Sequence, residues 1–291
     1  MSSNPLAEIF GFPIENQSNE AERYRKNALC PFNNKVPSCT KDKANDPLGV
    51  CSIYEKEDAL VTCPVRFRES WLIAEDASQF FFKPGTSWTS IAEVRLADKD
   101  GNTAGNIDVV LVSYDSRGQV LDFGSLEIQA VYISGNVRRP FEHYMTSRHR
   151  SQAFNWDGPN YPNADFLSSS RKRLAPQMLY KGGILKDWGK KQAVALQTLF
   201  FNTLPKLKEV PKSKADIAWM LYDLKLDKKI KRFRLTQNRI VYTKFDSALR
   251  QITTANPGKV GTFIEVLQQK LDEKLEGNPP DAPTLTDITL A

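Results

Sequence analysis

The sequence predicts an α/β protein with a cysteine-rich module near its N-terminus. Residues 90–134 alternate apolar and polar side chains and contain the turn Asp100-Gly101, a pattern typical of a three-stranded antiparallel meander. Other segments repeat apolar residues at the period of a helix. All four cysteines lie within residues 30–63. These observations together predict a core of sheet and helices, and a separate region that the cysteines organise.

The N-terminal half is expected to begin with helices and continue into the meander. We expect a short helix near the N-terminus, a second helix over residues 18–27, and then the cysteine loops up to residue 65. An amphipathic helix is predicted over residues 68–82, where Pro84-Gly85 ends it. Residues 140–170 are rich in Asn, Pro, Ser and aromatic residues without a clear period, so we expect a long ordered loop, which is often functional.

The C-terminal half predicts two helices around a second hairpin. Residues 187–204 are expected to be helical, with four apolar side chains on one face: Ala193, Leu196, Leu199 and Phe200. Residues 216–226 and 230–243 predict the hairpin. Residues 260–275 predict a helix whose apolar stripe belongs to a core or a dimer interface: Phe263, Ile264, Leu267 and Leu271. The proline-rich residues from Gly277 onward indicate a flexible tail.

The composition is that of a globular protein with an excess of positive charge. The chain has 291 residues, of which 41% are hydrophobic and 25% charged, and its formal net charge is +6. The positive charge suits a polyanionic partner such as nucleic acid, although it is also a common route to solubility. No stretch approaches the roughly 20 apolar residues of a membrane span, and the first residues show no secretory signal. A cytosolic protein is therefore expected.

The four cysteines predict a structural metal site. They are Cys30, Cys39, Cys51 and Cys63. Proline follows Cys30 and Cys63, and Gly49-Val50 precedes Cys51, a loop composition from which short metal knuckles are built. A tetrahedral four-cysteine site for zinc or iron would stabilise a segment that has few large apolar residues. The alternatives are four ordinary buried thiols or two disulfides, and disulfides are uncommon in the cytosol.

Two acidic positions lie in the predicted meander. Asp108 stands in one apolar strand, and Glu127 and Gln129 lie two apart in the next. Side chains two apart project from the same face of a strand, and a paired strand can place Asp108 beside them. A carboxylate in an apolar strand is costly unless it is exposed, paired or bound to a metal. Two converging carboxylates suit Mg2+, which takes oxygen ligands, and the backbone carbonyl of Ile128 can complete the coordination.

Several short segments, taken in order, resemble the NotI family of type II restriction endonucleases. In the cysteine region they are residues 7–11, 30–32, 38–41, 49–51 and 63–66. Further along they are residues 124–129 with Gly135, then residues 170–173 and 177–181. The ordered cysteine contexts together with Glu127-Ile128-Gln129 are specific, whereas any one of them alone is a weak signal. The chain is shorter than NotI, as the EagI-type members of the family are, and its spacings between cysteines differ from those of NotI.

The resemblance implies a fold and a set of site residues. The fold is a PD-(D/E)XK-type restriction endonuclease core, a central mixed sheet flanked by helices, with an N-terminal four-cysteine metal-binding module. The implied catalytic positions are Asp108 and Glu127, with Gln129 in place of the usual lysine and Glu93 as a further acid upstream. The four cysteines carry over as iron ligands. The expected regions are residues 1–66 for the metal module, residues 67–276 for the nuclease core with its DNA-recognition loops, and residues 277–291 for the flexible tail.

The implied activity is Mg2+-dependent cleavage of double-stranded DNA at a palindromic, GC-rich site similar to CGGCCG, leaving 5'-phosphate ends. A homodimer is expected because a palindrome presents two equal half-sites. A cognate DNA methyltransferase and a bacterial cytoplasmic location are expected for a restriction enzyme. Gln129 cannot take a proton, so we expect it to orient the attacking water. Glu93 is either a second-metal ligand or an outer acceptor, or it pairs with a neighbour such as Arg95.

Basic residues that follow the acids are candidates for DNA contact. They are Arg138 and Arg139, then Arg148 and Arg150 on either side of His149, and then Arg171 and Arg173 on either side of Lys172. Phosphate contacts position a duplex and bidentate arginines read guanine, so a GC-rich site would require several of them. Runs of surface charge are also commonly only solvated.

Two other functions stay open from the sequence. One is a non-catalytic, metal-stabilised DNA-binding protein in which the acids are structural. The other is a repair or modification-dependent nuclease on the same core. A histidine-metal nuclease is less expected, because the spacing of His143 and His149 fits no standard zinc pair.

Overall fold

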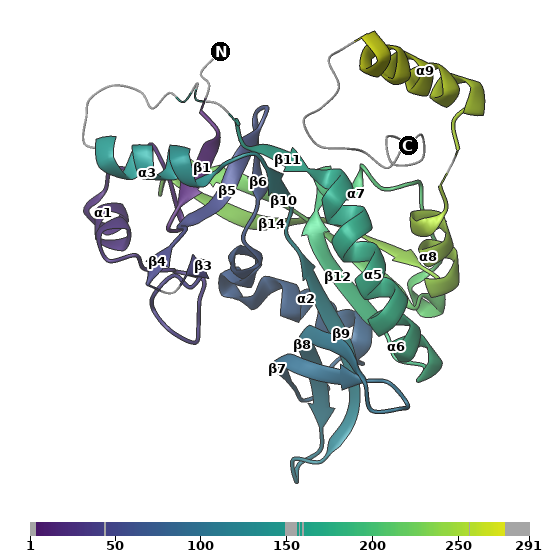
Figure 1. Cartoon of the computed structure of the whole chain (residues 1–291). Helices are drawn as coiled ribbons and strands as arrows, with labels where there is room; N and C mark the ends of the chain where they lie inside the picture. The colour runs from purple at the N-terminus through teal and green to yellow at the C-terminus, as the bar shows by residue number, and fades with distance from the viewer. Residues whose placement is uncertain are drawn as a thin grey trace. The chain divides into compact units, whose positions relative to one another are not determined.

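The computed structural model describes residues 4–43, 45–148, 156, 158, 160–255 and 257–276. The chain forms two units, Met1–Thr253 and Thr254–Ala291, and each is described by itself. The first unit contains the sheets, and the second contains one described helix (Figure 1). The predicted tail from residue 277 lies outside the described residues.

A six-stranded mixed sheet forms the centre of the first unit, with the order β14-β13-β12-β9-β8-β7. Its strands are β7 (Trp88–Ala97), β8 (Thr103–Tyr114), β9 (Val120–Gln129), β12 (Gln192–Gln197), β13 (Ile217–Asp227) and β14 (Arg232–Thr243). A short turn, η4 (Lys212–Lys214), precedes β13. Strand β12 runs parallel to β9 and β13, and the other neighbours are antiparallel. The predicted meander, second hairpin and central mixed sheet are therefore confirmed.

The central strand β12 lies where the sequence predicts a helix, so the prediction for residues 187–204 is wrong there. Every residue of β12 is buried. Ala193 and Ala195 pack on one face of the sheet, and Val194 and Leu196 pack on the other. A short apolar run that is buried on both faces shows no alternation, and periodicity alone cannot separate it from a buried helix. The helix α7 (Thr198–Phe201) follows the strand.

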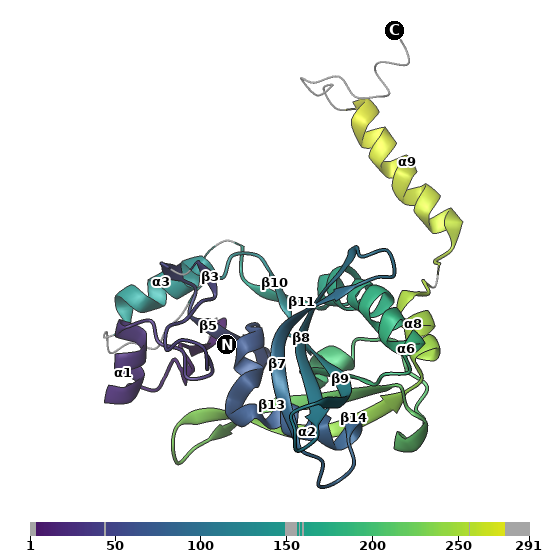
Figure 2. The same ribbon diagram turned by 90° about the horizontal axis from the view of Figure 1, so that it is seen from below.

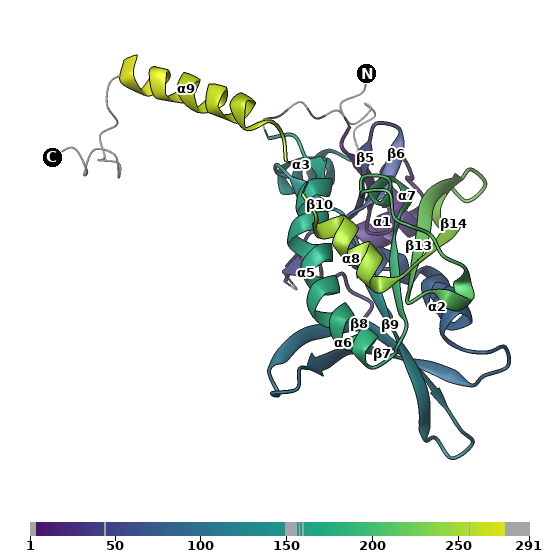
Figure 3. The same cartoon turned by 90° about the vertical axis from the view of Figure 1, so that its right-hand side faces the viewer.

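Helix α2 (Leu72–Phe81) covers one face of this sheet (Figure 3). Its side chains Ile73, Ala77 and Phe80 belong to the cluster that buries this face. The amphipathic helix is confirmed, but it begins later than predicted. The preceding turn, η1 (Pro64–Trp71), ends with Ser70 and Trp71 at positive φ, which a helix cannot continue through.

The opposite face is covered by the helical segment of residues 166–187 and by α8 (Phe245–Thr253), as Figures 2 and 3 show. In this segment α-helical turns alternate with π-helical turns: α4 (Phe166–Ser168), η2 (Ser169–Leu174), α5 (Ala175–Gln177), η3 (Met178–Gly182) and α6 (Gly183–Asp187). Leu174 and Met178 bury their side chains in the same cluster as Val194 and Trp219. The odd-numbered side chains of β9 therefore face this helical segment, because Leu126 and Ile128 face α2.

The N-terminal region forms a second sheet, with the order β2-β1-β5-β6. Its strands are β1 (Leu6–Ile9), β2 (Phe12–Pro13), β5 (Val50–Glu55) and β6 (Asp58–Val61). The predicted short N-terminal helix is wrong, because β1 is buried throughout and pairs on both sides. Gly11, at a φ of +81°, makes the tight turn into β2, and a Cβ there would lie 2.3 Å from Pro31.

The loops of this region carry α1 (Asn19–Lys26) and a short strand pair, β3 (Asp42–Lys43) and β4 (Asp46–Pro47). The helix confirms the prediction for residues 18–27. Ser18 caps it, because the Ser18 side chain accepts a hydrogen bond from the amide of Ala21.

Part of the loop expected over residues 140–170 is regular structure, so that prediction is wrong in part. Helix α3 (Arg138–Ser147) lies beside α1 in Figure 2, and the hydroxyl of Tyr144 donates to the carbonyl oxygen of Ile14 at 2.9 Å. Strand β10 (Tyr132–Ser134) pairs with β11 (Asn163–Asp165). The buried face of α3 has only three residues, too few for a periodic signal.

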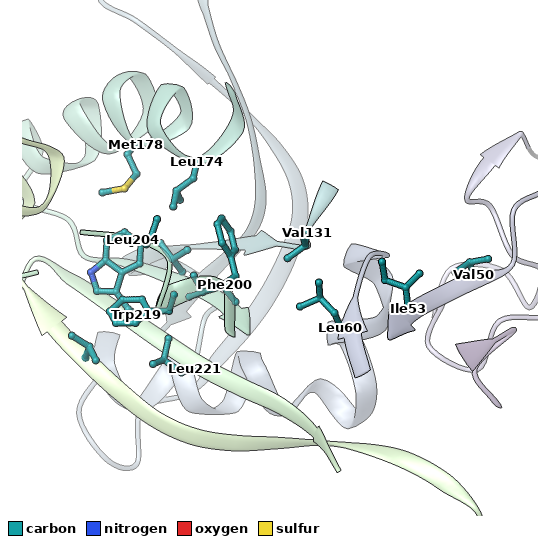
Figure 4. Packing of buried hydrophobic residues seen from close by; sticks show 14 of the residues in the cluster. Val50, Ile53, Leu60, Val131, Leu174, Met178, Phe200, Leu204, Trp219 and Leu221 are labelled. Atoms are coloured by element: carbon teal, nitrogen blue, oxygen red, sulfur yellow. The ribbon is translucent and has the colours of Figure 1, made fainter. Parts of the chain in front are cut away.

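One hydrophobic cluster connects the two sheets (Figure 4). Ile53 and Leu60 of the N-terminal sheet lie at one end, Val131 lies between, and Trp219 and Leu221 of β13 lie at the other end. The cysteine region and the central sheet therefore share buried side chains within one compact unit.

The second unit contains α9 (Val260–Glu276), which confirms the last predicted helix. The apolar stripe of this helix is exposed: Phe263, Ile264, Leu267 and Leu271. Among the helices of the described residues, none combines the length and the apolar character that crossing a membrane requires.

Candidate active site

Asp108 and Glu127 lie where strands β8 and β9 separate. Their pairing ends with Val109 opposite Leu126, so the two acids come directly after the last pair. Asp108 Oδ2 accepts a hydrogen bond from the backbone amide of Ile128 at 2.8 Å. The carboxylate thus takes the place of the backbone acceptor that the separated strand no longer offers. This bond fixes Asp108 beside the backbone of Glu127.

Glu127 is buried, and only one of its two carboxylate oxygens has a hydrogen-bond partner among the described residues. Its side chain is 2% exposed, and Nζ of Lys181 lies 2.6 Å from Oε2. Oε1 is buried and has no hydrogen-bond partner among the described atoms. Burial and the nearby charge of Asp108 raise the pKa of Glu127 to about 7, although Lys181 acts to lower it. An unpaired buried carboxylate oxygen is costly, and a hard divalent cation is the kind of group that satisfies it, so these residues fit such a cation.

Two side-chain pairs join strand β9 to the helical segment. Lys181 bonds to Glu127, and Nε2 of Gln129 donates to Oε1 of Gln177. Residues two apart on a strand are separated by roughly 6.7 Å, and residues four apart on a helix by about 6 Å of rise, so the two spacings match. Lys181 also donates to the backbone carbonyl of Asn106 in β8, at 2.9 Å. The helical segment therefore holds both candidate side chains of β9, Glu127 and Gln129.

Glu93 lies in β7, across the strand pairing from Asp108. Its side chain is 60% exposed and lies 3.1 Å from Nζ of Lys35, so it pairs with this lysine rather than with Arg95. Its φ of 58° is uncommon for a residue other than glycine. Among the residues that the structure describes, no three Asp, Glu, His or Cys side chains are arranged to hold one metal ion. The structure brings Asp108 and Glu127 together, whereas Glu93 is paired with Lys35.

The four cysteines lie in one region without forming a closed metal site. Leu29 and Ser38 face each other in an isolated β-bridge, and Cys30 and Cys39 come directly after them. The backbone amide of Cys63 donates a hydrogen bond to the carbonyl oxygen of Cys51 at 3.2 Å. All four thiols are free, so they form no disulfide with one another. Burial raises the pKa of Cys30 to about 11 and also raises those of Cys39 and Cys51, with neighbouring cysteines adding to each shift. The donors suit zinc or iron, but no three of them are arranged as ligands of one ion.

The match to a known family decides the class of protein to which this site belongs. Residues 14–235, more than half of the chain, match the family of the restriction endonuclease NotI. The chain belongs to the NotI restriction endonuclease family. Membership of this family makes the protein a nuclease, a hydrolase that binds double-stranded DNA. The matched segment includes Asp108, Glu127 and all four cysteines. No curated protein matches the chain.

The arginines that are candidates for DNA contact in this nuclease fall into two groups. Arg138 lies 2.6 Å from Asp42 and 2.9 Å from Asp46, and Arg148 lies 3.2 Å from Glu22. These two arginines join α3 to the N-terminal region. The exposed members are Arg139, Arg171 and Arg173, the last of which lies over the ring of Tyr132. Arg150, with His149, lies outside the described residues.

Lys181 and Gln177 are the site residues that sequence reasoning missed. Both lie in residues 177–181, whose only signal in the sequence is a resemblance to the family. Their spacing of four residues places them on one helix face, which is the signal that could have paired them with Glu127 and Gln129. A lysine on a helix is usually exposed, so the sequence offered no reason to prefer Lys181 over Lys186.

The raised pKa of Glu127 predicts a pH-dependent stability in the presence of EDTA. The carboxyl of Glu127 keeps its proton up to about pH 7 in the folded protein but only up to about pH 4.5 in the unfolded chain. The stabilisation of the folded state by this proton is therefore complete below pH 4.5 and is lost as the pH rises through 7. Relative to Glu127→Gln, the wild type is expected to lose about 3 kcal/mol of unfolding free energy across this window. Urea denaturation of both proteins at pH 5, 6, 7 and 8 measures the difference. A difference that does not change with pH would contradict the prediction.

Proposed function

We propose that this protein is a type II restriction endonuclease that cleaves double-stranded DNA at a specific sequence with Mg2+, on a PD-(D/E)XK-type core. The observation that carries the proposal is the pair of carboxylates at the end of the β8–β9 pairing. Asp108 is held by the amide of Ile128, and one buried oxygen of Glu127 has no hydrogen-bond partner among the residues that the structure describes. Buried polar atoms of purely structural residues are normally hydrogen-bonded, so the unpaired oxygen supports a ligand-binding role.

The proposed chemistry assigns each nearby group a task in phosphodiester hydrolysis. When bound, a divalent cation would lower the pKa of a water molecule and act as a Lewis acid toward the phosphate. Asp108, Glu127 and the backbone carbonyl of Ile128 would hold this cation. Gln129, which Gln177 holds in place, would orient the attacking water, because an amide donates and accepts hydrogen bonds but does not serve as a base here.

Glu93 is proposed as a further acid that acts from the strand beside Asp108. Its register position supports this role, and its present pairing with Lys35 is exposed and therefore weak. As a second-metal ligand or an outer acceptor, Glu93 would have to turn away from Lys35.

The proposed substrate is a palindromic, GC-rich site similar to CGGCCG, cut to leave 5'-phosphate ends by a homodimer. The net charge of +6 supports binding to a polyanion. Arg139 and Arg171 are exposed and available to contact a duplex, whereas Arg138 and Arg148 already pair with acids of the same chain. Each active site would cut one strand, so a two-fold symmetric dimer would cut both strands of the palindrome at equivalent positions. A cognate methyltransferase is the expected partner gene.

We also propose that the four cysteines bind one zinc or iron ion in a structural module over residues 1–66. Their free thiols and their mutual effect on pKa support this assignment, and a bound metal would have to draw together thiols that the structure does not arrange as ligands of one ion. Cys51→Ser is expected to lower the bound metal from about one equivalent per chain to below about 0.2, because thiolate ligands close such sites. Mass spectrometry for zinc and iron, on protein purified without added metal, measures this content. Ser38→Ala, beside Cys39, is the control, and a wild-type protein without either metal would contradict the proposal.

Digestion of DNA by the purified full chain tests the proposed activity. Phage lambda DNA and a GC-rich plasmid are incubated with the protein and Mg2+, with and without EDTA, and the fragment ends are sequenced. Discrete fragments that disappear with EDTA are expected, and their ends give the site and the cut position. A smear with random ends would favour a repair nuclease. Intact DNA that is retarded on a gel, for both substrates, would favour a non-catalytic binding protein.

A further inference from the structure

A buried ammonium group lies at the candidate active site, although Gln129 occupies the position of the usual lysine. The Lys181 side chain is 4% exposed, and its Nζ lies 2.6 Å from Oε2 of Glu127 and 2.9 Å from the carbonyl oxygen of Asn106. An ammonium is costly to remove from water unless it is paired and hydrogen-bonded. Both bonds go to the strands that carry Asp108 and Glu127, namely β8 and β9. The helical segment of residues 166–187 therefore places the positive charge of Lys181 at the candidate site.

The backbone that carries Lys181 is held close to its neighbours. Gly182 follows it directly, and a Cβ at that position would lie 2.5 Å from the ring of Phe245 in α8. Met178, nearly one turn earlier, is buried in the core cluster. Lys181 itself lies in the π-helical turn η3, a distortion that is frequent at functional sites. This close packing limits how far Lys181 can move from Glu127.

We propose that Lys181 is a positioning residue of the active site, which holds Glu127 through Oε2 and keeps Oε1 as the oxygen that binds the divalent cation. The two oxygens of Glu127 differ in this way, because Oε2 is bonded to Lys181 whereas Oε1 has no hydrogen-bond partner in the part of the chain that the structure describes. The inference rests on the proposed function. It places the positive charge of the site on the helical segment instead of on β9.

The positioning role makes cation affinity and cleavage rate change in opposite directions when the lysine is lost. Lys181 repels a cation at Glu127, because like charges at short distance raise the energy, so its removal tightens cation binding. Without this lysine, Glu127 is free to reorient and bind through both oxygens, and a misplacement of about 1 Å can slow a reaction by about 100-fold. A purely structural ion pair would instead lower both quantities together, along with the folded fraction.

Lys181→Met tests this role with two readouts. Mn2+ binding, measured by electron paramagnetic resonance at pH 8, is expected to become about 3- to 10-fold tighter. Single-turnover cleavage at saturating Mg2+ is expected to become about 100-fold slower. The control is Lys186→Met in the same helical segment, since Lys186 is 41% exposed and pairs with an exposed carboxylate of Asp246. Glu127→Gln identifies the Mn2+ site by abolishing it.

Cleavage by Lys181→Met within about 3-fold of the wild-type rate would overturn the positioning role, because the misplacement that it predicts costs far more. Loss of Mn2+ binding together with cleavage would overturn it in favour of a structural pair. If wild-type protein cleaves no DNA, the proposed function fails, and Mn2+ binding alone then tests the positioning role of Lys181. Tighter Mn2+ binding by Lys181→Met supports this role, and unchanged binding overturns it. If Lys181→Met does not fold, Lys181→Gln, which keeps a donor without the charge, is measured in its place.

Discussion

Glu127→Gln is expected to slow DNA cleavage by about 1,000-fold or more, because the loss of a carboxylate ligand removes several kcal/mol of stabilisation at the reacting phosphate. The substitution keeps the size of the side chain and removes its charge. The buried Oε1, which has no hydrogen-bond partner among the described residues, would be lost as a ligand for the cation. Single-turnover cleavage of a DNA fragment that contains the site, with Mg2+ varied, measures the effect.

Two comparisons separate a loss of chemistry from a loss of folding or DNA binding. Glu57→Gln changes an exposed acid in the turn between β5 and β6, so it should leave the rate unchanged. DNA binding by Glu127→Gln in Ca2+, measured by gel retardation, should stay within about 3-fold of wild type, since binding depends mostly on contacts to the phosphates. A Glu127→Gln protein that cleaves at the wild-type rate would remove this residue from the site.

Arg66→Met is expected to lower the free energy of unfolding by about 3–5 kcal/mol, because it leaves a buried carboxylate without its partner. Arg66 and Glu8 are both fully buried, and Nε of Arg66 lies 3.0 Å from Oε2 of Glu8. The same guanidinium donates to Glu69 at 2.6 Å and to the carbonyl oxygen of Phe233 at 3.0 Å. It also lies 4.2 Å from the ring centre of Phe32, so it ties the cysteine region to the central sheet. Urea denaturation followed by circular dichroism measures the loss.

Arg234→Met provides the matched control for this prediction. Arg234 pairs with the same Glu69 at 3.2 Å but is 53% exposed, so its removal should cost less than about 1 kcal/mol. The double variant Glu8→Leu/Arg66→Met should recover part of the loss, because an apolar pair replaces both buried charges. A cost for Arg66→Met no greater than that for Arg234→Met would show that the buried pair does not hold the two regions together.

The candidate site divides between residues that the sequence identifies and residues that it does not. Asp108 and Glu127 stand out because a carboxylate in an apolar strand is costly, and this cost can be read from neighbouring residues. Lys181 follows Glu127 by more than 50 positions and reaches it from another element, at 2.6 Å. Nothing near Lys181 in the chain marks it, since lysines are common on exposed helix faces. Only the packing of the helical segment on the sheet makes it a buried partner.

The sequence by itself determined the elements whose signals are local. The three strands of the meander, the β13–β14 hairpin, α1, α2 and α9 follow from alternation, helical period and turn residues within a few positions. The tertiary structure alone decided the elements whose partners are distant. Strand β12 is a strand because β9 and β13 bond to it on both sides, and β1 is a strand because β5 lies beside it. Hydrogen bonds between distant strands and the burial of both faces leave no period in the chain itself, so the sequence alone does not identify these two strands.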